Sequence, residues 1–294
     1  MPPIAIITDT DSSLPLDLAK QYNIVQVPII VQFGEESFRD VYDIDNARVF
    51  ARVDREGNLP KTAAPSPGKF VEAYQAAFDT GADQILCLTI SSEMSAVYSA
   101  ARSAVEMFTG KIIKVVDSRT VSFGEGLMAV EAAKAIVNGA SMDEAVAQAE
   151  NLRNRTHLFA ALSTLKYLAM SGRVGHVAAG FGSLLEIKPI LTLRNEKLEM
   201  LERIRTQGKA WARLIELVIE ASGGCDAEQL AILHVNAPEA ACQFEQQVRA
   251  ALTCPPEMRR VEMTPGLSLH TGAGLVGIVL VTKNQFSNHY PCPT

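Results

Sequence analysis

The sequence contains no long hydrophobic run and no closely spaced cysteine pair, and these absences exclude several classes of protein. Nothing in it approaches the ~18 consecutive apolar residues that cross a bilayer, and no basic segment precedes the apolar residues 4–7. The five cysteines are widely spaced and form no Cys-x-x-Cys motif. We therefore expect neither export nor membrane insertion, and neither a disulfide framework nor a bound metal ion.

Positive charge is also scarce. The chain has 27 lysines and arginines against 33 aspartates and glutamates, and the basic residues are dispersed. Because a nucleic-acid interface needs a concentrated positive surface, we expect no nucleic-acid partner. An odd number of separated cysteines is typical of free thiols in a reducing compartment, so the sequence favours the cytoplasm.

The first half of the chain alternates strand and helix patterns. Short, β-branched apolar runs of the kind found in strands buried on both faces occupy residues 4–7, 85–90 and 112–116. Helical periodicity marks residues 67–79, 95–109, 126–138 and 141–156, the last opening with the capping-box pattern of Ser141 and Glu144. This alternation predicts a mostly parallel sheet with helices on both faces.

The second half has a different order, which predicts a second lobe. Strand patterns cover residues 158–163, 190–194, 198–202, 230–235 and 277–281, and helical patterns cover residues 210–221 and 238–252. The polar stretch from Arg194 to Lys197 predicts a hairpin, hence a mixed or antiparallel sheet. We expect a two-lobed α/β protein with residues 1–156 in the N-terminal lobe, residues 157–294 in the C-terminal lobe, and a ligand cleft between them.

Several polar segments follow predicted strands, where open α/β sheets bind ligands. After the first strand, Ser12 or Ser13 is expected to cap a helix from about Leu16, and Asp9 to order the turn. Asp9 and Asp11 alone lack the further ligands that Mg²⁺ requires, so no metal site is assigned. Ser66 reads as an N-cap followed by Pro67 at the first helical position.

Three further polar groups are candidates for ligand contact. Thr62 is not needed for the cap at Ser66, so its hydroxyl is available to the cleft. Ser91 and Ser92 lie in a strand-to-helix turn, where unpaired amides favour an anionic group, although one serine as a cap and the others solvated is an equal alternative. His270 stands among glycines and can bind a carboxylate, or serve only a structural role.

An apolar surface precedes a glycine stop in the second half. Leu162, Leu165, Leu168 and Met170 form an apolar surface with only one lysine between them, and Gly172 follows. This composition indicates either core or the wall of an apolar tunnel.

These motifs together resemble the DegV family of bacterial fatty-acid-binding proteins over nearly the whole chain. The matching residues are Thr8-Asp9-x-x-Ser12 with Leu14-Pro15; Thr62-x-x-Pro65-Ser66; Ser91-Ser92-x-Met94-Ser95 with Tyr98-Ser99-Ala100; Val116-Asp117-Ser118; Leu165-x-Tyr167-Leu168-x-x-x-Gly172-Arg173; Leu184-Leu185-x-Ile187-Lys188-Pro189-Ile190; Arg203-x-Arg205; and His270-x-Gly272-x-Gly274. The order and spacing of the whole set, rather than any one motif, make the resemblance specific.

The resemblance implies a ligand, a partner and a set of binding residues. A long-chain fatty acid would lie between the lobes, with its carboxylate at Thr62, Ser91, Ser92 and the glycine-flanked His270, and with Gly272 beside it. Family members present the acid to a separate fatty-acid kinase that forms an acyl phosphate. The chain would then be a carrier without catalytic residues or cofactor, and Arg205 would lie near the mouth of the cleft.

Two departures and two alternatives accompany this interpretation. The chain has Ala63 where the family usually has Ser, and Ala96-Val97 where it usually has Gly-Thr, which removes two hydroxyls. One alternative is a lipid or ester hydrolase with Ser92 or Ser95 as nucleophile and His270 as base, although no Gly-x-Ser-x-Gly elbow is present. The other is a binding module for a different hydrophobic ligand.

Overall fold

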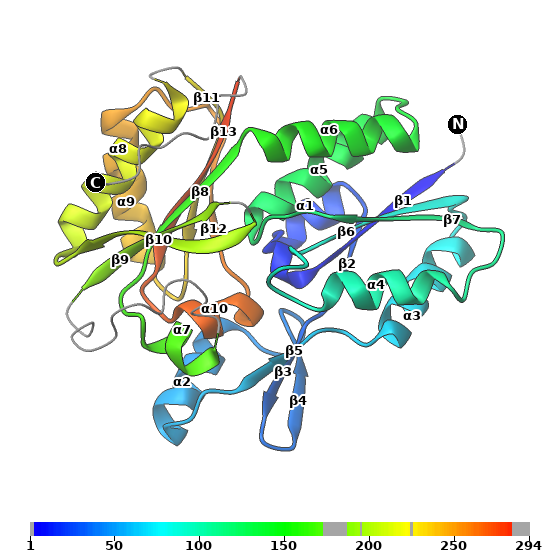
Figure 1. Cartoon of the computed structure of the whole chain (residues 1–294), viewed down its shortest axis with the longest axis horizontal. Coiled ribbons are helices and arrows are strands. Elements are labelled where there is room, and N and C mark those ends of the chain that lie inside the picture. Colours follow the sequence, from blue (N-terminus) through cyan, green and yellow to red (C-terminus); the bar gives the residue numbers. More distant parts are fainter. Residues whose placement is uncertain (1–2, 173–186, 195, 224–225, 284–294) are drawn as a thin grey trace.

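The computed structural model describes residues 3–172, 187–194, 196–223 and 226–283 (Figure 1). Arg173, Leu184, Leu185, Asn195, Cys225 and Cys292, on which some sequence predictions rest, lie outside the described residues. Among the described cysteines, Cys87, Cys242 and Cys254 are free thiols. None of the helices in the described ranges is long and apolar enough to cross a membrane.

The first sheet is parallel, as the sequence predicts. Its strands are β1 (Ile4–Asp9), β2 (Ile24–Val27), β6 (Gln84–Thr89) and β7 (Ile112–Asp117), in the order β2-β1-β6-β7. The central strands carry continuous apolar residues because helices cover both of their faces. Strand β2 was not expected, since four residues that include Gln26 give too short a pattern.

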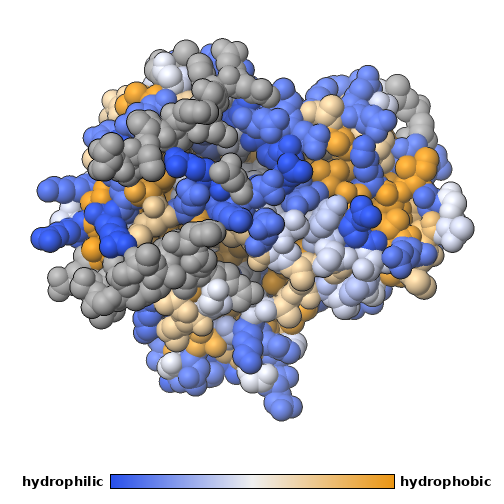
Figure 2. All heavy atoms as spheres, viewed as in Figure 1, coloured by the Kyte–Doolittle hydropathy of each residue, from blue (hydrophilic) through white to orange (hydrophobic). Residues whose placement is uncertain are grey.

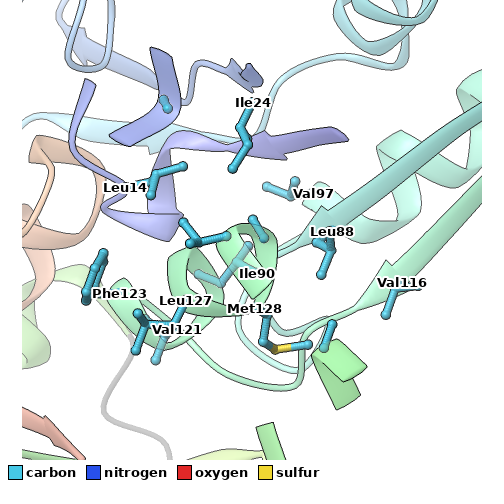
Figure 3. Close-up of a cluster of buried hydrophobic side chains, with 14 of the residues drawn as sticks. Leu14, Ile24, Leu88, Ile90, Val97, Val116, Val121, Phe123, Leu127 and Met128 are labelled. Atoms are coloured by element: carbon cyan, nitrogen blue, oxygen red, sulfur yellow. The ribbon is translucent and has the colours of Figure 1, made fainter. Parts of the chain in front are cut away.

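Helices cover both faces of this sheet. They are α1 (Leu16–Gln21), α3 (Pro67–Asp79), α4 (Val97–Val105), α5 (Phe123–Val137) and α6 (Met142–Asn154). Figure 1 shows α3 and α4 on one side of the sheet and α5 and α6 on the other. Figure 3 shows Leu127 and Met128 of α5 in one apolar cluster with Leu88 of β6 and Ile90, the residue after that strand. The expected capping box of Ser141 and Glu144 is present at the start of α6.

The second sheet is mixed. Strands β8 (Thr156–Ala161), β9 (Lys188–Arg194), β10 (Lys197–Ile204), β11 (Ala227–His234), β12 (Met258–Glu262) and β13 (Val276–Thr282) lie in the order β10-β9-β8-β13-β11-β12. Only the β11–β12 pair is parallel, and β9 and β10 form the expected antiparallel pair. The outer face packs on α8 (Gln207–Ser222) and α9 (Pro238–Ala251), while the inner face turns toward the first lobe. Strand β8 begins at Thr156, but the lobe boundary near that residue stays a prediction.

A third sheet was not predicted. It contains β3 (Ile30–Phe33), β4 (Glu36–Arg39) and β5 (Lys61–Ala63), in the antiparallel order β4-β3-β5, with α2 (Asn46–Glu56) nearby. Its strands have three or four residues each, so no alternation of polar and apolar residues could develop in the sequence. Strand β5 brings Thr62 between the two larger sheets.

Short helices complete the region between the lobes. They are η1 (Thr10–Ser12), α7 (Lys166–Ser171) and α10 (Pro265–Thr271). Helix α7 ends at Gly172 in the left-handed conformation, as the sequence predicts. Leu165, at the N-cap position of α7, and Leu168 within the helix are buried, whereas Met170 is exposed.

Two capping predictions need correction. Neither Ser12 nor Ser13 caps α1, whose N-cap position is Pro15. Ser12 belongs to η1 instead, where Asp9 is the N-cap and accepts from the Asp11 amide at 2.9 Å, so Asp9 does order the turn. Ser66 occupies the N-cap position of α3 with Pro67 after it, but its side chain makes no capping hydrogen bond.

The surface mixes polar and apolar residues. Figure 2 shows apolar colour gathered over the end of the molecule that carries α3, α4 and β7. Met107 and Ile112 in these parts of the chain are exposed.

We predict that Gly266→Ala destabilises the protein by about 1–3 kcal/mol, because overpacking of this kind forces neighbours to move. A Cβ at this position in α10 would lie 2.5 Å from Asp11 Oδ1 and 3.1 Å from Asp40 Oδ2. Gly208→Ala in α8 is the matched control, since no atom of the described residues lies within 4 Å of the added Cβ. Urea unfolding should show a lowered midpoint for the first variant and an unchanged or slightly raised one for the second. Equal midpoints for both variants would contradict the prediction.

Candidate functional site

A cavity of about 340 Å³ lies between the inner face of the second sheet and the first lobe. Most of its wall is apolar, formed by Ile29, Ile90, Val121, Leu158, Ala160, Leu162, Leu168, Leu191, Leu198, Leu233, Met263, Leu267 and Leu275. Cavities of a few hundred Å³ with apolar walls and a few polar groups are the usual form of small-molecule sites. This cavity is therefore the candidate functional site.

Alternation along β8 builds the apolar wall. Leu158 and Ala160 point to the inner face, and Leu162 continues that face just beyond the strand, so all three line the cavity. Phe159 and Ala161 point the other way and pack on the outer cluster that includes α8 and α9. Leu165 and Leu168, which the sequence marked as core or tunnel wall, divide between these roles: Leu168 lines the cavity and Leu165 is buried beside it.

The polar part of the cavity contains a threonine and a histidine. Thr62 Oγ1 of β5 lies 3.1 Å from His270 Nε2 of α10, although the two residues are 208 positions apart. Both residues line the cavity and are half-buried. The two side chains, which the family resemblance places at one carboxylate, thus form one polar pair with hydrogen-bonding capacity suited to an anionic or polar group.

Ser91 and Ser92 lie in the turn before α4 but do not line the cavity. The carbonyl of Ser91 accepts from the amides of Met94 and Ser95 at 3.0 and 3.1 Å, and its Oγ accepts from the Glu93 amide at 3.3 Å. Ser92 is exposed, and its amide donates to the Asp117 carboxylate. Met94, Ser95 and Ala96, at the N-terminal end of α4, do line the cavity.

Gly272 and Arg205 also lie outside the cavity wall. Gly272 has a φ of 83°, and a Cβ there would clash with the ring of Tyr167, so glycine is required for the chain to leave α10 against α7. Arg205 is exposed and follows the last residue of β10.

Four polar residues line the cavity without having been assigned to it from the sequence: Asp11, Ser95, Ser122 and Thr271. Asp11 and Ser95 were considered only for a metal ion and a nucleophile. Ser122, the N-cap residue of α5, is buried at φ 57° and donates through Oγ to Ser13 Oγ at 3.1 Å. Ser122 reaches the cavity because the turn before α5 packs against the turn that contains Ser13, and this contact between distant segments leaves no signal in the local sequence.

Two buried acids lie behind the cavity. Burial raises the pKa of Asp9 to about 7, and burial together with the Asp9 charge raises the pKa of Glu125. Thr8 Oγ1 donates to Glu125 Oε1 at 2.7 Å, and the Ile90 amide donates to Asp9 Oδ2 at 2.9 Å. Because two adjacent buried carboxylates cannot both ionise cheaply, we expect Glu125 to keep its proton.

A third buried acid, Asp40, connects the end of β1 with α10. Thr10 Oγ1 donates to Asp40 Oδ2 at 2.8 Å, and the Gly266 amide also stabilises the Asp40 carboxylate. Thr264 Oγ1, at the N-cap position of α10, donates to the Thr10 carbonyl at 3.0 Å. These bonds fix α10, and with it His270, against the first lobe.

The fold and this site define a class: two-lobed α/β proteins with a mostly apolar cavity between the lobes. The model of a family described as "Uncharacterised protein, DegV family" matches residues 3–283, and the chain belongs to the DegV family. The resemblance seen in the sequence is thereby confirmed.

Relatives match over nearly the full length. A DegV domain-containing protein of Streptomyces coelicolor is 32% identical over 95% of this chain and 99% of its own, and one of Mycobacterium tuberculosis is 34% identical over 94% and 96%. A solved DegV family protein of Thermus thermophilus, described by its fatty acid binding, has a TM-score of 0.88 at 30% identity, over 96% of this chain and 100% of that one. DegV of Bacillus subtilis, described as a fatty acid binding protein, has a TM-score of 0.86 at 27% identity, with the same coverage.

We predict that the wild-type protein loses stability as the pH rises from about 4 to about 6, and that Asp40→Asn reduces this loss. Burial raises the pKa of Asp40 from 3.8 to about 6, so the group is protonated in both states below about pH 4. As pH rises through the folded pKa, the free energy of unfolding should fall by an amount on the order of 3 kcal/mol from this group. Urea unfolding at a series of pH values measures the slope, which the variant should reduce.

Asp43→Asn is the control for this experiment. Asp43 is a half-buried neighbour whose pKa the Arg39 guanidinium lowers to about 2, so its contribution has the opposite sign and lies at lower pH. Its variant should therefore keep the wild-type slope between pH 4 and pH 6. Parallel curves for Asp40→Asn and the wild type would show that Asp40 does not titrate in this range.

Proposed function

We propose that the protein binds one long-chain fatty acid, with the acyl tail in the apolar cavity and the carboxylate at Thr62 and His270. The observation that carries the proposal is a mostly apolar cavity with this hydrogen-bonded pair in its wall. The similar proteins of Thermus thermophilus and Bacillus subtilis, both described by fatty acid binding, support it.

The two parts of the ligand have different tasks in this arrangement. Each buried CH₂ of the tail contributes about 0.8 kcal/mol, so the tail dominates the affinity. The head group sets the orientation of the ligand, because the carboxylate oxygens need hydrogen-bond donors and only the polar part of the cavity wall supplies them. His270 Nε2 and Thr62 Oγ1 lie 3.1 Å apart, close enough for one carboxylate to accept from both.

Ser91, Ser92 and Gly272 enter the proposal as residues that shape the site. The Ser91 carbonyl holds the amides of Met94 and Ser95, and those two residues reach the cavity. Ser92 fixes the same turn to Asp117. Gly272 allows the chain to turn directly after α10, which keeps His270 beside Thr62.

We further propose that the protein presents the bound acid to a fatty-acid kinase, which forms the acyl phosphate, and that the protein catalyses no reaction alone. The resemblance in the sequence is the basis for this partner. Arg205 is exposed beyond β10 and is proposed to contact the kinase or the emerging phosphate.

Two other functions remain to be tested against this one. A serine hydrolase would use Ser92 or Ser95 with His270, but the contact recorded for His270 Nε2 is Thr62. A p-nitrophenyl ester assay separates the classes, because a carrier should release no nitrophenol above background. Organic extraction of the purified protein, followed by mass spectrometry, would reveal a different hydrophobic ligand.

We predict that the purified protein carries a fatty acid and that His270→Ala and Thr62→Val both weaken its binding. Loss of a charge-assisted hydrogen bond should cost roughly 1.5–3 kcal/mol of binding free energy. Binding of palmitic acid to delipidated protein, measured by calorimetry, checks the affinity, and circular dichroism checks the fold.

The control for these variants is Thr109→Val, the same exchange at an exposed position after α4. It should leave the affinity unchanged. If both cavity variants have a native circular dichroism spectrum and wild-type affinity, Thr62 and His270 do not bind the carboxylate and have only a structural role.

We predict that Arg205→Ala leaves the bound lipid unchanged but slows acyl-phosphate formation by the partner kinase. Removal of an exposed charge from a contact surface should act on the encounter and cost up to about tenfold in rate below saturation. Lys20→Ala, an exposed change on α1, is the control and should not alter the rate. An unchanged rate for lipid-loaded Arg205→Ala would remove Arg205 from the kinase contact.

A further inference from the structure

The inner face of the second sheet consists of cross-strand rows. In the middle row, Leu191, Ala160, Gly277 and Leu233 lie side by side on β9, β8, β13 and β11. A second row, called the far row, lies two residues away along β8. It contains Leu158 of β8, Leu193 of β9, which lies opposite Leu158 when the β8–β9 register is continued, and Leu198 of β10, which pairs with Leu193. A near row lies on the other side and contains Leu162 and Leu275.

The near row adjoins the polar pair. The chain leaves α10 directly after His270 and Thr271, and positions 272 and 274 are packed against Tyr167 and Ser163. Ser163 follows Leu162, so the histidine lies close to this end of β8. Leu158 is four residues further along the strand, at roughly 3.3 Å per residue, or about 13 Å. A tail that starts at His270 and follows the sheet therefore meets the near, middle and far rows in turn.

The centre of the middle row is small while its neighbours are large. Position 160 has only a methyl group, and it lines the cavity. Position 277 excludes any side chain, because a Cβ there would lie 2.9 Å from the Phe159 carbonyl oxygen and 3.1 Å from Ala160 Cβ. Leucines occupy both ends of this row and the cavity-lining positions of the rows beyond it. The wall thus has a depression at Ala160, bounded on the far side by Leu158 and Leu198.

We propose that Ala160 determines the chain length of the bound acid: the tail crosses the depression at Ala160, and Leu158 and Leu198 limit its end. This inference rests on the proposed function, since it assigns the tail of a fatty acid to the cavity. A larger residue at position 160 removes the passage to the far row. A smaller residue at position 158 extends the space beyond it.

The test compares affinities of the delipidated full-length protein for decanoic, myristic, palmitic and stearic acids. Ala160→Leu should lower the affinity for palmitic and stearic acids by about tenfold or more, because roughly two CH₂ groups lose their burial. Its affinity for decanoic acid should fall by a smaller factor, because a ten-carbon chain has fewer CH₂ groups beyond Ala160. Leu158→Ala should shift the preference in the opposite direction, toward stearic acid.

Leu193→Ala is the matched control for Leu158→Ala. Leu193 belongs to the same row but does not line the cavity, so its loss should reduce stability without changing the order of preference among the acids. Ala160→Val is a smaller enlargement at the same position. If Ala160→Leu does not fold, the chain-length preferences of Ala160→Val and Leu158→Ala test the proposal instead.

The outcomes separate this inference from the function on which it rests. If the wild type binds the acids but the variants at positions 160 and 158 keep its chain-length profile, or weaken all acids by one factor, the role of Ala160 is overturned. If the wild type binds none of the acids, the proposed function fails, and the inference with it.

Discussion

The hydrogen bond from Thr264 Oγ1 to the Thr10 carbonyl, 3.0 Å long, is the contact on which the arrangement of the site depends. It joins the start of α10 to η1, at the end of the first strand, across 254 positions of the chain. Asn46 Nδ2 donates to the Met263 carbonyl at 2.6 Å and adds α2 to the same junction. His270 belongs to α10, so the distance between His270 and Thr62 follows from how this helix is held.

The junction uses buried polar groups where apolar packing would be simpler. Asp40 accepts from Thr10, and the Gly266 amide approaches its carboxylate. Such groups cost desolvation free energy, which the raised pKa of Asp40 records, and they contribute geometry in return. Two apolar surfaces can shift against each other with little loss of contact, whereas a hydrogen bond to a fixed backbone group is lost when its partner moves. The desolvation cost of these polar groups therefore accompanies a fixed position of α10, and with it of His270.

Much of the fold could be predicted because its main elements have strong local patterns. Helix α3 occupies residues 67–79 as expected, and β6 and β7 begin within a residue of their predicted starts. The third sheet could not be predicted, since β5 has three residues and pairs with β3 about thirty positions earlier. Such pairing depends on tertiary contacts rather than on periodicity. The sequence predicted that the second sheet is mixed or antiparallel, but it did not predict the order of its strands.

The site was predictable to a smaller extent, for a physical reason. The family resemblance placed Thr62 and His270 at one carboxylate, but their direct contact spans 208 positions and leaves no local pattern. Ser91 and Ser92 looked like ligand groups because they precede a helix, and the structure uses them to hold the turn that brings Ser95 to the cavity. A hydroxyl in a turn can serve the backbone or a ligand with the same chemistry. Only its orientation distinguishes the two roles, and orientation is a property of the folded chain.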